Sequence, residues 1–157
     1  MIENIQSFAD SFPDWLQWLG VMIVSAIPFV ESYFGSVIGV AIGLGPVVAI
    51  LVAVIGNVIS MLAFVYGAGA IRDKATKNEE VEEKPKRQRL KRMFDKFGVP
   101  GVSLLGQTLL PSQITSSAMV GFGANRNVVA FWQVISIILW GVLFGVLATL
   151  GIELALR

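Results

Sequence analysis

The chain has 157 residues, of which 55% are hydrophobic and 15% are charged, and its formal net charge is +1. Soluble domains contain about 25% charged residues, so this composition and the mean hydropathy of +0.72 predict one all-α integral membrane domain with no soluble domain of similar size beside it. Cys and His are absent, which removes disulfides, the commonest metal ligands and the commonest general base. We therefore expect no metal site, no cofactor and no enzymatic activity.

Residues 1–14 form the first predicted element, a short amphipathic helix at the membrane interface. Ile2, Ile5, Phe8 and Phe12 recur at roughly helical spacing, with acidic and polar residues between them. A frayed polar start to the first membrane segment is the alternative. The stretch contains no Lys or Arg, so it differs from a cleaved signal peptide.

Residues 15–70 are predicted to form the first half of the membrane domain, and their only charged side chain is Glu31. An ionised carboxylate in hydrocarbon costs several kcal/mol, so a membrane protein keeps one where it faces protein or a wet cavity. Glu31 is therefore the first candidate for a functional residue.

Gly and Pro residues interrupt this apolar run, and we interpret residues 31–46 as a re-entrant hairpin. Its breakers are Pro28, Gly35 and Pro46. Lipid cannot satisfy the backbone groups that such residues free, so the segment must be buried in protein or line a watery cavity.

Residues 47–68 are predicted to form a long helix that returns across the membrane. Within it Gly56 permits a close helix contact, and the amide of Asn57 offers an interhelical hydrogen bond.

Residues 71–97 form the one substantial hydrophilic loop and hold most of the 12 Lys and Arg residues. This excess of positive charge places the loop in the cytoplasm. Between residues 87 and 97 one helical face is predicted to lie against the inner leaflet, and it consists of Leu90, Met93, Phe94 and Phe97. The alternative is a loop that only sets orientation, and nucleic acid is not an expected partner.

Residues 98–151 form the second half, which begins with a predicted re-entrant hairpin over residues 98–125, broken by Gly106 and Pro111. Polar side chains cluster at its centre: Gln107, Thr108, Gln113, Thr115 and Ser116.

A long apolar run over residues 128–150 follows the second hairpin and is predicted to cross the membrane. Arg126, just before it, is expected on the same side as the basic loop. Gly141 and Gly145 have the small-xxx-small spacing of packed helices and, with the small chain size, indicate a homo-oligomer, expected to be a dimer.

The two halves share weak internal symmetry. Pro28 and Glu31 precede Val47-Val48-Ala49-Ile50. Pro111 and Gln113 precede Val128-Val129-Ala130-Phe131 by about the same distance. Inverted copies of this kind place a transport site where their broken elements meet. We therefore predict that Glu31 faces the polar residues of the second hairpin, and that Asn57 belongs to the same binding site. The alternative is a pair of hairpins that merely pack.

Several of these motifs resemble known families. Ile27-Pro28-Phe29-Val30-Glu31, Gly45-Pro46 and Gly56-Asn57 resemble the small multidrug export proteins, while Phe94-Asp95-Lys96-Phe97-Gly98, Leu110-Pro111, Gly121 and Trp140-Gly141 resemble the DedA, or VTT-domain, superfamily. The resemblance covers roughly residues 20–151. It implies two opposed re-entrant hairpins and a role in drug resistance, in lipid scrambling or in the transport of lipid carriers such as undecaprenyl phosphate.

The chain also departs from the family pattern. DedA proteins typically have an arginine on each side of the second-hairpin proline, whereas the neighbourhood of Pro111 offers Thr108, Gln113 and Ile114. The export family often follows its glutamate with an arginine, whereas Ser32 follows Glu31. Phosphate recognition normally relies on Arg, Lys or helix N-termini, so a lone carboxylate suits a cation or a proton better.

The sequence thus favours a multi-pass transporter in the plasma membrane of a prokaryote that exports small amphipathic cations in exchange for protons at Glu31. The main alternative is a flippase or scramblase for a polyprenyl phosphate or a phospholipid, and a third possibility is a scaffold that transports nothing.

Overall fold

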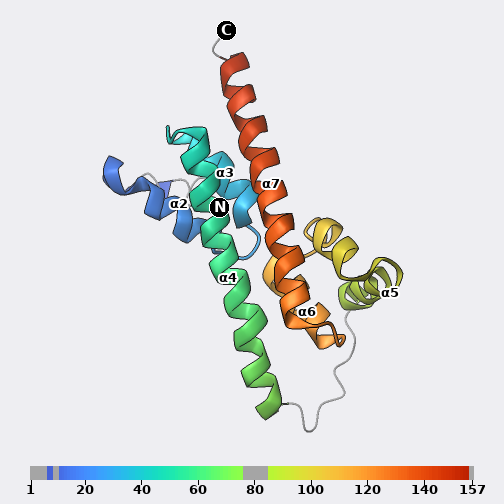
Figure 1. The fold of residues 1–157 in the computed structure, drawn as a ribbon. Coiled ribbons are helices and arrows are strands. Elements are labelled where there is room, and N and C mark those ends of the chain that lie inside the picture. Colours follow the sequence, from blue (N-terminus) through green and yellow to red (C-terminus); the bar gives the residue numbers. More distant parts are fainter. Residues whose placement is uncertain (1–6, 9–10, 76–84, 156–157) are drawn as a thin grey trace. The chain divides into compact units, whose positions relative to one another are not determined.

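The structure is a computed structural model, and it describes residues 7–8, 11–75 and 85–155 (Figure 1). These residues form helices and no β-strand, which confirms the predicted all-α class for this part of the chain. Most of the predicted N-terminal helix over residues 1–14, and residues 76–84 of the predicted basic loop, lie outside the described residues. The elements are η1 (Asp14–Leu16), α2 (Gln17–Ser25), α3 (Glu31–Ala41), α4 (Pro46–Ala75), α5 (Pro85–Gly106), α6 (Ser112–Gly121) and α7 (Arg126–Ala155).

The chain divides into two compact units, and each long helix contributes one part to each of them. Unit 1 comprises Met1–Ile59 and Ile137–Arg157, so it contains α2, α3, the first part of α4 and the last part of α7. Unit 2 comprises Ser60–Ser136, so it contains the last part of α4, α5, α6 and the first part of α7.

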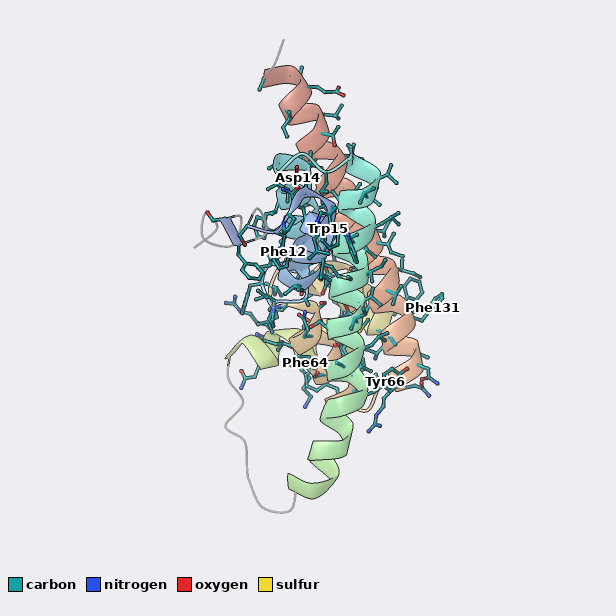
Figure 2. The ribbon with its side chains drawn as sticks, turned by 90° about the vertical axis from the view of Figure 1, so that its left-hand side faces the viewer. Phe12, Asp14, Trp15, Phe64, Tyr66 and Phe131 are labelled. Atoms are coloured by element: carbon teal, nitrogen blue, oxygen red, sulfur yellow. The ribbon has the colours of Figure 1, made fainter. Side chains whose placement is uncertain are left out.

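Two of the described helices, α4 and α7, are long and apolar enough to cross a membrane. The apolar window of α4 is only 28% buried and that of α7 only 22%. The core helix of a soluble protein would instead be mostly buried. Phe131, for example, is 62% exposed and points away from α7 (Figure 2). The exposed apolar faces are of the kind that lipid covers.

The first helical pair in unit 1 is α2 packed on α3, and the turn between them spans residues 26–30, around Pro28. The predicted hairpin over residues 31–46 covers α3 and the turn after it, and its re-entrant character stays a prediction. Gly35 was wrong as a breaker, because it lies inside α3. A Cβ there would clash with the side chain of Ser25 on α2, so Gly35 serves close helix packing.

The glycines of α7 also serve packing within the chain. A Cβ at Gly141 would lie 2.9 Å from Val54 of α4 and 3.2 Å from Ser32 of α3, and a Cβ at Gly145 would clash with Ile50 of α4. The structure thus uses these glycines inside unit 1. They give no support to a dimer contact, and the dimer stays a prediction.

In unit 2, α5 bends at Gly98, whose φ of 64° is non-helical, and Pro100 follows two residues later. Before the bend, Phe97 of the predicted inner-leaflet face is 49% exposed, whereas two other residues of that face contact protein. Leu90 is buried, and the ring of Phe94 lies 5.7 Å from that of Phe122. This part of the predicted inner-leaflet face therefore packs against protein.

The second helical pair, α5 after its bend and α6, falls inside the predicted range of residues 98–125. Gly106 ends α5, and Pro111 is the residue before α6, as expected of breakers. Pro46 likewise begins α4. A proline is tolerated at such a helix start because its missing amide would have no helical partner there.

The same backbone pattern occurs in both halves of the chain. The helices α4 and α7 have 30 residues each, and each follows a short helix that ends in the same hydrogen-bonded turn. In the first turn the Leu44 amide donates to the Gly39 carbonyl, and in the second the Ala124 amide donates to the Met119 carbonyl. Gly43 and Gly123 supply the positive φ that this helix ending requires.

Candidate functional site

Glu31 lies in the first turn of α3 and is fully buried, with 0% of its surface exposed. Its φ is 54° and that of Phe29 is 76°, values in the left-handed region that residues other than Gly seldom adopt. Such strained backbone concentrates at functional sites. The amide groups at a helix N-terminus also stabilise negative charge, so the local backbone favours a carboxylate at this position.

The packing of α3 on α4 fixes which residues share a level with Glu31. The two helices run antiparallel, and small residues pair along their contact: Gly39 with Ala49, and Gly35 with Ala53. One further turn along this register places Glu31 opposite Asn57, which is also fully buried. Unit 1 therefore brings a carboxyl and a carboxamide to one buried level, and their shared role in binding stays a prediction.

Ser32 and Ser36 lie on the side of α3 that faces α7. The Ser32 hydroxyl donates to the Ile137 carbonyl of α7 over 2.8 Å, and the Ser36 hydroxyl donates to the Ser32 carbonyl over 2.6 Å. α3 thus packs against both α4 and α7, and these contacts fix the position of Glu31. Each serine hydroxyl uses its proton in this bond, so toward a ligand it can only accept.

The predicted site residues of the second hairpin all lie in unit 2, whereas Glu31 and Asn57 lie in unit 1. Gln113 is fully buried, and its amide nitrogen lies 3.3 Å from the hydroxyl of Ser60 on α4. That α6 to α4 contact gives Gln113 a structural role. The prediction that Glu31 faces these residues stays a prediction.

The hydroxyls of the second hairpin mostly satisfy nearby backbone carbonyls. Thr108 donates to Leu105 over 2.7 Å, Thr115 to Leu110 over 3.1 Å, and Ser116 to Gln113 over 3.0 Å. Such local bonds stabilise turns and short helices. Their role here is to hold the turn and the start of α6, which the sequence interpretation as a binding cluster did not anticipate.

Gln107 differs from these neighbours. It is 8% exposed, and neither atom of its amide has a hydrogen-bond partner among the described residues. Three further polar residues of unit 2, which the sequence analysis passed over, are fully buried: Ser103, Gln133 and Ser136. A signal for the last two was available, because Gln133 and Ser136 fall on one face of an otherwise apolar helix.

Among the described residues, no three Asp, Glu, His or Cys side chains lie close enough together to hold a metal ion. Comparison with protein-family models, curated proteins and solved structures finds no match for this chain. The family resemblance therefore rests on the quoted motifs alone.

Proposed function

We propose that this protein is a secondary transporter in the plasma membrane of a prokaryote, which exports small amphipathic cations in exchange for protons. The observation that supports this proposal most directly is Glu31, a fully buried carboxyl at a strained turn between two short helices. A carboxylate binds a cation or a proton at the same oxygen atoms, so the two compete for one site. Competition at a single acid is sufficient to couple opposite movements of substrate and proton.

The exposed apolar faces of α4 and α7 support membrane insertion as a multi-pass protein. Leu51 and Ile59 of α4 are 55% and 60% exposed, and Leu147 of α7 is 54% exposed. Burying such surface is worth about 25 cal/mol per Å², and lipid provides that burial for a single chain. The positive charge of residues 71–97 puts this segment on the cytoplasmic side.

The lengths of the short helices support re-entrant hairpins. α2 has 9 residues and α3 has 11, so at about 1.5 Å per residue neither approaches the roughly 30 Å of the hydrocarbon core. A helix of this length fits a segment that enters the membrane and returns to the same side. The antiparallel contacts of α4 with α7, together with the repeated backbone pattern, support an inverted repeat.

The charge of unit 1 supports a cationic substrate over an anionic one. The described residues of this unit, 7–8, 11–59 and 137–155, include no Lys or Arg in their sequence. An anionic headgroup entering here would meet the carboxylate of Glu31 and no positive side chain. Repulsion in a medium of low dielectric constant opposes its entry.

The test is proton flux in proteoliposomes that contain a pH-sensitive dye, with a quaternary ammonium compound as the substrate. Wild type should move protons when the compound is added, and Glu31→Gln should not. Glu153→Gln is the matched control, because it removes the carboxylate of an exposed residue at the end of α7 in the same unit. Equal flux in wild type and Glu31→Gln contradicts the proposal.

A lipid flippase or scramblase is the second candidate, and the buried polar residues of unit 2 favour it. Gln107, Gln113 and Gln133 are uncharged groups that an amphipathic lipid headgroup could contact in passing. The discriminating observation is movement of a fluorescent phospholipid or a short polyprenyl phosphate between leaflets with no linked proton flux. That result would also make Glu31 a structural residue.

A further inference from the structure

Three buried polar side chains of unit 2 have polar atoms with no hydrogen-bond partner in the described part of the chain. The atoms are the Ser103 hydroxyl and both amide atoms of Gln107 and of Gln133. These side chains are 0%, 8% and 0% exposed. Other buried polar side chains of the same unit, such as Ser116 and Ser136, do have partners. The unsatisfied groups are therefore a local feature.

A hydrogen bond joins Ser136 of α7 to Ser103 of α5, and helical spacing puts Gln133 and Gln107 on the same two faces. These four residues are here called the α5–α7 seam. Ser103 and Gln107 are one helical turn apart, as are Gln133 and Ser136. The Ser136 hydroxyl donates to the Ser103 carbonyl over 2.7 Å, which joins the two faces. All four residues lie in unit 2.

A buried amide without a partner destabilises the conformation that contains it, because its hydrogen bonds to water have been lost and not replaced. In this conformation the orphan atoms are shielded, so they regain hydrogen bonds only when the seam loosens. Water that entered the seam would restore those hydrogen bonds and offset the cost.

The chemistry of the seam selects what enters it. An amide offers both donors and an acceptor and bears no charge. The described cationic side chains of the unit, Arg89, Lys91, Arg92, Lys96 and Arg126, are all exposed, as is Asp95. Without a buried charge, neither an anion nor a cation is compensated at the seam. Water, which is neutral and both donates and accepts, fits these groups.

We infer that the α5–α7 seam opens to bind water, so that Ser103, Gln107 and Gln133 line a hydrated compartment inside unit 2. The inference requires that unit 2 lies in a membrane. It does not depend on cation export or on Glu31.

The absence of native Cys allows a direct test by thiol labelling in proteoliposomes. Three single-Cys variants lie within one turn of α5 and at similar depth: Ser103→Cys in the seam, Val102→Cys in the apolar core and Leu105→Cys on the exposed face. The probe is a small, water-soluble methanethiosulfonate, which reacts with the hydrated thiolate. Labelling after denaturation gives the full signal for each variant.

We expect Ser103→Cys to react at least about tenfold faster than both controls, since an apolar environment suppresses the thiolate. Adding Gln133→Leu to Ser103→Cys should slow this reaction, because it removes one of the groups that water would bind. Equally slow reaction of all three single variants overturns the inference, since the seam then stays closed. Equally fast reaction also overturns it, because this part of α5 would then simply face bulk water.

Discussion

Gly56 of α4 is the position where one added methyl group should cost most. A Cβ there would lie 2.9 Å from the carbonyl carbon and 3.1 Å from the Cα of Met22 on α2, and closer still to the carbonyl oxygen. Ordinary contacts of a Cβ begin at about 3.4 Å. Because the obstacle is backbone, no side-chain rotation removes the clash, and α2 has to move away from α4.

Overpacking of this kind typically costs about 1–3 kcal/mol. The intrinsic preference of helices for Ala over Gly returns up to about 1 kcal/mol, so Gly56→Ala should lower the free energy of unfolding by roughly 1–2 kcal/mol. At roughly 2–4 °C per kcal/mol for a chain of this size, the expected fall in Tm is several degrees. The assay heats the detergent-solubilised protein to a series of temperatures. Size-exclusion chromatography then measures the fraction that remains folded at each temperature.

Gly67→Ala on the same helix is the matched control, because no described atom lies within 4 Å of the position that its Cβ would take. This variant gains helix preference without a clash, and its Tm should equal or exceed that of wild type. Equal Tm values for the two variants would refute the close contact of α2 with α4.

Three further outcomes follow from the packing of unit 1. Gly145→Ala should lower Tm because its Cβ would clash with Ile50. Gly151→Ala is the control and should leave Tm unchanged, because no described atom lies within 4 Å of its Cβ position. The same thermal assay compares the two variants. Phe29→Gly should relieve about 1 kcal/mol of backbone strain and keep or raise Tm, which a fall of several degrees would contradict. Ser32→Ala should cost about 1 kcal/mol by removing the hydrogen bond to the Ile137 carbonyl, and an unchanged unfolding midpoint in a denaturing-detergent titration would show that this bond contributes nothing.

The sequence predicted the long helices well, because apolar runs longer than a membrane span have few alternatives. The prediction of residues 47–68 and 128–150 falls inside α4 and α7. It did not identify the turn at residues 26–30 that joins α2 to α3. The reason is physical: Pro28 and two residues with positive φ turn the chain, and only Pro28 is visible as a breaker in the sequence.

The candidate site was predictable only in part. Glu31 and Asn57 were identified from one charge and one amide in apolar runs, and both are fully buried. The binding role of the hydroxyl cluster in the second hairpin stays a prediction, because composition cannot distinguish a Thr that binds a ligand from one that satisfies its own turn, as Thr115 does. Gln133 was passed over although Ser136, one turn later on the same face, was a signal for it.

The repeated backbone has different chemistry in its two copies. The described helical pair of unit 1 holds one buried carboxyl and no Lys or Arg, whereas the helical pair of unit 2 holds buried amides and hydroxyls and no buried charge. A proton can therefore be bound at Glu31 but not at Gln107 or Gln133, which do not titrate. If both the coupling and the hydration experiments give the expected results, proton binding belongs to unit 1 and water binding to unit 2. Glu31→Gln would then abolish proton flux and leave the labelling of Ser103→Cys unchanged, which separates the two units by function.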